Sequence, residues 1–181
     1  MSDRIRQELS KQYSMQEVEY NSAIAKGSSK YLTQLQQPLS KDILEGFALA
    51  RYTAEFWSSY LQRTGDEIEQ VSQLAMSLMA IEEPAYLTWI QLYDPDQPWR
   101  GPTLERSLDS VPTSLYYAAL LGSSMITRLL LDKGADVNAQ GGLFGNALYA
   151  ASFKGYEQIV KTLLNAGGHR RRDDVSVLRH E

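Results

Sequence analysis

The sequence predicts an all-α protein in which a helical N-terminal block precedes a short solenoid of helix pairs joined by β-turn fingers. Apolar residues recur at helical spacing over residues 40–92. A pattern with a 33-residue period occupies residues 107–168. The composition, 43% hydrophobic and 22% charged, is that of an ordinary globular protein. We therefore expect a helical connector or capping block over 1–106, two repeats over 107–168 and a polar tail over 169–181.

The N-terminal block is expected to begin with a helical segment over residues 1–37, which becomes apolar near Tyr31, Leu32 and Leu35. Ser40 is a suitable N-cap for a long amphipathic helix that ends near Gly65. One apolar stripe defines the buried face of this helix: Ile43, Phe47, Ala50, Ala54, Trp57 and Leu61.

Two further helices complete the block. Asp66, with Glu69 three residues later, has the spacing of a capping box. The helix that follows is expected to bury Ile68, Val71, Ala75, Leu78 and Met79. Pro84 suits the first turn of a third helix that extends to about Leu92. The proline-rich segment 93–102 then forms a connector.

The repeat is defined by seven matches at an offset of 33 residues. The matching pairs are Leu115 with Leu148, Ala118 with Ala151, Gly122 with Gly155, Ile126 with Ile159, Leu130 with Leu163, Leu131 with Leu164 and Gly134 with Gly167. In the first unit we expect helices over 114–121 and about 124–133, each ended by a glycine that tolerates the left-handed conformation. Residues 135–142 predict a tight finger around one buried valine, Val137.

These residues resemble the ankyrin repeat, a unit of a β-turn and two antiparallel helices. Residues 129–140, LLLDKGADVNAQ, match the second helix and finger of that family. The family's Thr-Pro-Leu-His motif is represented by residues 113–116, TSLY, and 146–149, NALY. Both units lack the proline that favours the first turn and the histidine that bonds to the finger backbone. Thr113 and Asn146 remain good N-caps.

The helical block resembles the corresponding stretch of fungal NACHT–ankyrin proteins, which are NLR-like receptors. The resemblance lies in residues 31–35, 47–57 and 89–96. In that family this stretch joins a nucleotidase module to an ankyrin array. The sequence contains no Gly-x-x-x-x-Gly-Lys-Ser/Thr segment, so the phosphate-binding loop of a nucleotidase is absent. The resemblance implies a connector with the first repeats of such a receptor, or a small stand-alone relative.

Composition excludes several classes of chemistry. There are no cysteines and only two histidines, and the net charge is −4. Thiolate catalysis, zinc fingers and general nucleic-acid binding are therefore not expected. We predict no catalytic residue, no cofactor and no metal. The polar N-terminus lacks a secretory signal, and no apolar stretch reaches the about 18 residues of a membrane span. We expect an intracellular protein, in the cytoplasm or nucleus, that does not bind membranes.

Three charged motifs receive structural interpretations. Asp94-Pro95-Asp96 has too few oxygen ligands for calcium and is interpreted as a turn. Glu82-Glu83 precedes Pro84, where negative charge complements the helix dipole. The Arg170–Arg172 run is followed directly by two aspartates and is interpreted as a solvated tail.

The predicted function is non-enzymatic protein–protein interaction, as an adaptor or as part of an NLR-like receptor. The alternative is an accessory subunit or minor enzyme that uses the aromatic side chains of the helical block as a small-molecule pocket. A packed core explains the same aromatic residues, which are Phe47, Tyr52, Phe56, Trp57, Tyr60, Trp89, Tyr93 and Trp99.

The resemblance to ankyrin repeats also implies a partner-binding face, formed by the finger tips and the first helix of each unit. Leu120, Leu121 and Phe153 are apolar at positions that commonly hold polar residues, so they either bind a partner or pack internally. Transferred position by position, the predicted face is Asp109, Ser110, Leu120, Leu121, Gln140, Leu143, Phe144, Phe153 and Lys154.

Overall fold

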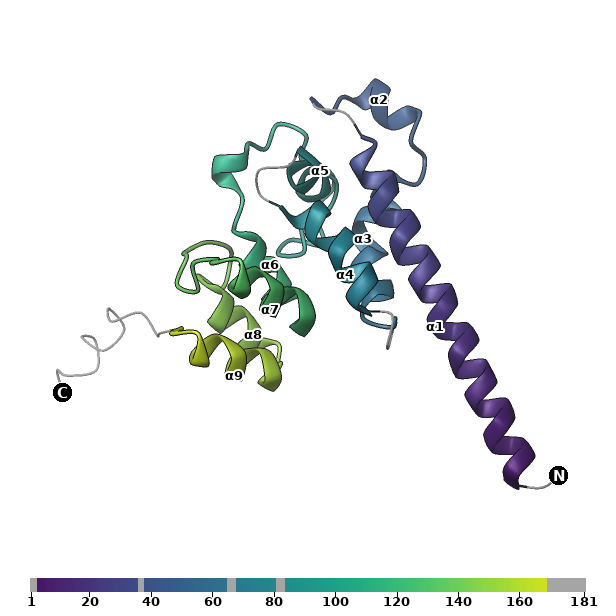
Figure 1. Ribbon diagram of the computed structural model, residues 1–181. Coiled ribbons are helices and arrows are strands. Elements are labelled where there is room, and N and C mark those ends of the chain that lie inside the picture. The colour runs from purple at the N-terminus through teal and green to yellow at the C-terminus, as the bar shows by residue number, and fades with distance from the viewer. Residues whose placement is uncertain (1–2, 36–37, 65–67, 81–83, 169–181) are drawn as a thin grey trace. The chain divides into compact units, whose positions relative to one another are not determined.

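The computed structural model describes residues 3–35, 38–64, 68–80 and 84–168, and its regular elements in these ranges are all helices (Figure 1). The all-α prediction is confirmed. The chain divides into two compact units, Met1–Val111 and Pro112–Glu181. Each unit is described separately below.

The N-terminal unit is built around the long helix α1, Asp3–Thr33. Small and apolar side chains on its C-terminal half, including Ser22, Ala25 and Leu32, are buried. Helices α3, Ala50–Leu61, and α4, Ile68–Met79, both pack against α1. Small side chains let these helix backbones approach closely, which is how α1 forms one side of the core.

The prediction of one long helix from Ser40 to Gly65 is wrong, because the chain forms two helices there. Helix α2, Lys41–Glu45, begins at Ser40, whose hydroxyl oxygen accepts a hydrogen bond from the Ile43 amide at 3.2 Å. It ends at Gly46, whose amide donates to the Ile43 and Leu44 carbonyls and closes a tight turn. Glycine favours such a break because it has a low helix propensity.

The predicted apolar stripe is buried within α3, at Ala50, Ala54, Trp57 and Leu61. Before the break, the stripe residues Ile43 and Phe47 are only half-buried. The expected capping residue Asp66 and the Glu82-Glu83 pair lie outside the described residues, as do the side chains of Ile68 and Glu69.

Helices α4 and α5 complete the N-terminal core. The predicted residues Val71, Ala75, Leu78 and Met79 are buried in α4. Helix α5, Pro84–Leu92, has the predicted bounds and buries all its residues except Pro84 and Leu87. The Trp57 and Trp89 rings meet edge to face with centroids 5.2 Å apart, and the Trp89 indole donates to the Ala54 carbonyl at 2.9 Å.

The C-terminal unit contains two helix pairs. Helices α6, Ser114–Leu120, and α7, Ser124–Asp132, form the first pair. Helices α8, Ala147–Phe153, and α9, Glu157–Asn165, form the second. Helix α6 packs against α8, and α7 packs against α9. The two pairs therefore stack in register at the 33-residue spacing.

The helix ends of this unit follow the sequence prediction. The Thr113 hydroxyl and the Asn146 amide oxygen accept hydrogen bonds from the Tyr116 and Tyr149 amides at 3.4 and 2.9 Å. Gly122 and Gly134 have φ values of 77° and 84°, the left-handed conformation expected after each helix. Val137 in the finger is half-buried, less than the full burial expected.

Candidate functional site

The finger between α7 and α8 is held by short-range polar contacts. The Asn138 amide donates to the Asp136 carboxylate at 2.9 Å, which closes an Asx turn. The Asn138 side-chain amide donates to the Gly167 carbonyl at 3.2 Å and so ties the finger to the residues that follow α9. The Gln140 side chain donates to the Asn138 carbonyl at 2.7 Å. These contacts limit the conformations of the finger.

The tip of the finger packs against the side chain of Tyr116. It occupies the position of the missing histidine and is buried. Its hydroxyl accepts a hydrogen bond from the Phe144 amide at 3.3 Å. Gly142 lies against the hydroxyl end of the ring, because a Cβ atom added there would be 2.0 Å from Tyr116 Cζ. This role of Tyr116 was not predicted from the sequence, although a tyrosine at the histidine position carries a hydroxyl that can accept a hydrogen bond from the finger backbone.

Two phenylalanines meet at the surface beside this tip. The rings of Phe144 and Phe153 have centroids 4.6 Å apart and an interplanar angle of 34°. Phe153 is 72% exposed and Leu143, next to Phe144, is 61% exposed. Lys154 follows Phe153 at the C-cap of α8 and is exposed. We refer to Leu143, Phe144, Phe153 and Lys154 as the Phe144 patch.

The remaining residues of the predicted face are distributed differently. Leu120 is only 4% exposed, so of its two predicted roles, partner binding or internal packing, its burial favours internal packing. Helix α6 packs between α7 and α8 and is buried throughout. Leu121 is half-buried and Gln140 is exposed. Asp109 and Ser110 are exposed and belong to the 3-10 helix η2, Leu108–Ser110, of the N-terminal unit.

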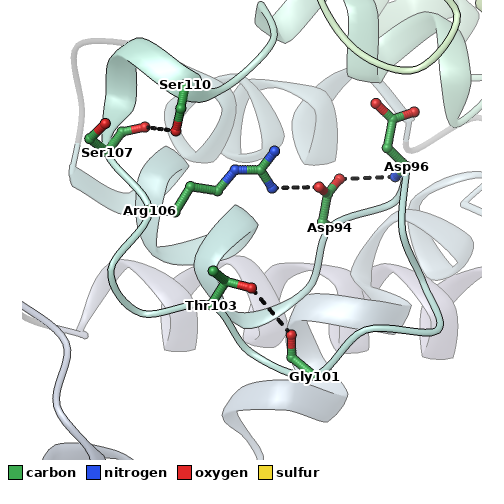
Figure 2. Close-up of polar contacts among 7 residues, drawn as sticks. All are labelled: Asp94, Asp96, Gly101, Thr103, Arg106, Ser107 and Ser110. Atoms are coloured by element: carbon green, nitrogen blue, oxygen red, sulfur yellow. Dashed lines mark hydrogen bonds and ion pairs between the residues drawn. The ribbon is translucent and has the colours of Figure 1, made fainter.

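The connector after α5 is held in its conformation by contacts of the Asp94 carboxylate and the Gln91 side chain. Asp94 accepts a hydrogen bond from the Asp96 amide at 2.9 Å and is paired with the guanidinium of Arg106 (Figure 2). The Gln91 side chain donates to the Leu104 and Arg106 carbonyls at 2.9 and 2.8 Å. The Asp94-Pro95-Asp96 motif therefore builds a turn, as predicted.

A cavity of about 250 Å³ lies in this connector. Its lining includes Ile90, Asp94, Gln97, Arg100, Thr103 and Arg106. None of the eight aromatic residues considered for a small-molecule pocket lines it. Among those residues, Trp57 and Trp89 are fully buried in the core, whereas Trp99 is 74% exposed.

Two features are absent from the part of the chain that the structure describes. No described helix has the length and apolar character needed to cross a membrane. Within the same residues, no group of three or more histidine, aspartate or glutamate side chains is arranged to hold a metal ion.

Residues 96–174 match the family described as "Ankyrin repeats (3 copies)". The two stacked helix pairs and the finger between them lie within this range. This part of the chain contains ankyrin repeats. The resemblance to ankyrin repeats predicted from residues 129–140 is thus confirmed. No solved structure matches the chain.

Two similar proteins are both longer than this chain. The first, from Monascus ruber, is named "Azaphilone pigments biosynthesis cluster protein L" and is 31% identical over 184 residues. That alignment covers 92% of this chain but only 38% of the relative, so the chain spans well under half of its length. The second is the "Inactive serine/threonine-protein kinase TEX14" of Bos taurus, 40% identical over 62 residues, which are 34% of this chain and 4% of the relative.

Proposed function

We propose that this ankyrin-repeat protein is a non-enzymatic protein-interaction module whose partner binds the Phe144 patch. The observation that carries the proposal is the contact between the half-buried Phe144 ring and the exposed Phe153 ring at the surface. Grouped apolar side chains on a surface mark interaction sites, and aromatic residues are enriched among those that dominate binding energy.

The support beneath the patch favours binding. Tyr116 holds the Phe144 backbone, and Asn138 ties the finger to the end of α9. A surface already held in one conformation loses little conformational entropy when a partner binds. We therefore expect the partner to dock onto a preformed surface rather than to order it.

The chemistry of the patch suggests what the partner presents. Its three apolar residues need an apolar side chain opposite them, and Lys154 is its one charged member. A segment with a large apolar side chain next to a carboxylate meets both requirements. With a net charge of −4, the chain offers little attraction for nucleic acid.

The experiment uses full-length protein with a photo-crosslinker beside the patch, followed by titration of the purified captured protein. Phe153→Glu should weaken binding of that protein by at least about tenfold, because it puts a charge where an apolar side chain docks. Phe153 is exposed, so the far-UV circular dichroism and melting curve should not change.

Leu49→Glu is the matched control, since Leu49 is a similarly exposed apolar residue (58%) in the N-terminal unit. It should leave binding unchanged. Equal loss in both variants, or unchanged binding in Phe153→Glu, would exclude the patch as the binding surface.

Two different cellular roles fit an interaction module of this kind. The residues that resemble fungal NACHT–ankyrin proteins favour an intracellular NLR-like receptor. The name of the Monascus ruber relative favours the alternative of an accessory subunit beside biosynthetic enzymes. Mapping the full transcript distinguishes them, because a receptor requires an upstream segment with a phosphate-binding loop.

A further inference from the structure

Helix α1 is held to the N-terminal unit mainly by small side chains. Among its described side chains, the only large apolar one that is buried is Leu32; the other buried ones are Asn21, Ser22, Ala25, Ser28 and Ser29. Helix α5, with nine residues, buries Tyr86, Trp89, Ile90 and Leu92. Because hydrophobic stabilisation follows the apolar area removed from water, the docking of α1 gains less per residue than that of α5.

Three of the buried polar side chains of α1 also lack hydrogen bonds. Asn21 Nδ2, Ser22 Oγ and Ser29 Oγ are buried without a partner among the described residues, as is Ser72 Oγ on α4, which packs against α1. Each of these atoms loses contact with water when α1 docks and gains nothing in return, which disfavours the docked state. On α5, by contrast, the Gln91 side chain donates to two backbone carbonyls.

Gly27 divides α1 into two parts. A Cβ atom added at Gly27 would meet nothing within 4 Å, and its φ is not positive, so neither close packing nor a left-handed conformation requires glycine there. Glycine inside a helix weakens it relative to alanine, and helices bend most readily at glycine and serine. Two serines follow Gly27 directly.

The part of α1 after Gly27 has the firmer anchors. Leu32 is completely buried, and Leu35, just beyond the helix, is 4% exposed. The Tyr31 ring meets the Phe47 ring edge to face, with centroids 5.5 Å apart. Before Gly27, the described side chains that are buried are Asn21, Ser22 and Ala25, and the first two carry the unpartnered atoms.

We propose that residues 3–26 of α1, called the strap, undock by bending at Gly27 while residues 28–35 and helices α3, α4 and α5 stay in place. Opening returns Asn21 and Ser22 to water and exposes the side chains that the strap covers. Leu32 stays buried in the open state. The strap belongs to the N-terminal unit, so its motion can be tested separately from binding at the Phe144 patch.

The test uses an introduced thiol as the probe, because the chain has no cysteine. Ser22 and Ser29 are matched sites on either side of Gly27: both are on α1, 1% and 2% exposed, with unpartnered hydroxyls. In the full chain without denaturant, the thiol of Ser22→Cys should react with a thiol reagent at least about tenfold faster than that of Ser29→Cys, because opening of the strap leaves Leu32 buried. Circular dichroism verifies that both variants are folded.

Gly27→Ala tests the bend itself. Added to Ser22→Cys, it should slow labelling about two- to fivefold, since alanine strengthens the helix at a position with room for its methyl group. Ser14→Ala is the control, because Ser14 is an exposed residue of the strap; it should leave labelling unchanged. An unchanged rate in Gly27→Ala would overturn bending at Gly27.

Hydrogen exchange of the unchanged chain supplies a measurement that needs no variant. Amides of residues 21–26 should exchange at least about tenfold faster than those of residues 28–33. Equal labelling of the two thiols would overturn the proposal, whether both are protected until the chain unfolds or both react together. Equal exchange in the two parts of α1 would do the same.

Discussion

Gly142→Ala should destabilise the C-terminal unit far more than the same substitution at Gly145, three residues later in the same finger. Both glycines have left-handed φ values, 73° and 80°. An alanine in this conformation costs about 1–2 kcal/mol at either position. The difference between the two variants therefore isolates what surrounds each added methyl group.

At Gly142 the added methyl would meet the Tyr116 ring, with Cζ at 2.0 Å and Cε1 at 2.4 Å. The ring is buried and must shift, which costs about 1–3 kcal/mol as overpacking. The shift also breaks the hydrogen bond from the Phe144 amide, worth about 1 kcal/mol. At Gly145 nothing lies within 4 Å of the methyl position. We expect Gly142→Ala to lower the free energy of unfolding by about 2–4 kcal/mol more than Gly145→Ala.

The assay is urea unfolding followed by far-UV circular dichroism. Tryptophan fluorescence is unsuitable because all three tryptophans precede residue 112. Adding Tyr116→Leu to Gly142→Ala should recover part of the loss, because the double variant lacks the ring atoms that clash. Equal losses for Gly142→Ala and Gly145→Ala would refute the placement of Tyr116 beneath the finger.

Three other predictions concern stability. Trp89→Phe should cost about 1 kcal/mol more than Trp57→Phe, because the Trp89 indole donates to the Ala54 carbonyl while that of Trp57 is buried without a hydrogen-bond partner. Thermal melts compare the two, and a larger loss for Trp57→Phe would contradict this reasoning. Asn146→Ala should cost about 0.5–2 kcal/mol in urea unfolding, because it removes the cap on the Tyr149 amide; unchanged stability would show that the cap contributes nothing. Residues 107–181 expressed alone should melt with poor cooperativity and bind a hydrophobic dye, since about three repeats are needed for a stable array. A sharp melt like that of the full chain would contradict this last expectation.

Local features of the chain could be predicted well. The caps at Ser40, Thr113 and Asn146, and the glycines that end α6 and α7, depend on residues within one turn of each other. The 33-residue spacing compares residues of the same kind in equivalent surroundings, so it identified both helix pairs without knowledge of any contact.

The long helix predicted from Ser40 shows where local pattern failed. An apolar stripe at helical spacing continues through Gly46, but the backbone turns there and restarts at Ala50. The spacing of the apolar stripe predicts which side chains can be buried. It does not predict whether the helix remains unbroken between them.

The sequence by itself determined the all-α class, the helix ends and the repeat, because these follow from interactions between residues close together in the chain. Only the tertiary structure decided which apolar residues form a surface. Leu120 and Phe153 end equivalent helices of the two pairs, yet α6 is covered by α7 and α8, whereas Phe153 remains exposed beside Phe144. Tyr116 meets a finger 26 residues further along the chain at Gly142. The exposure of a side chain and its long-range contacts depend on which distant segments of the chain pack against it. The spacing of residues along the sequence does not predict this packing.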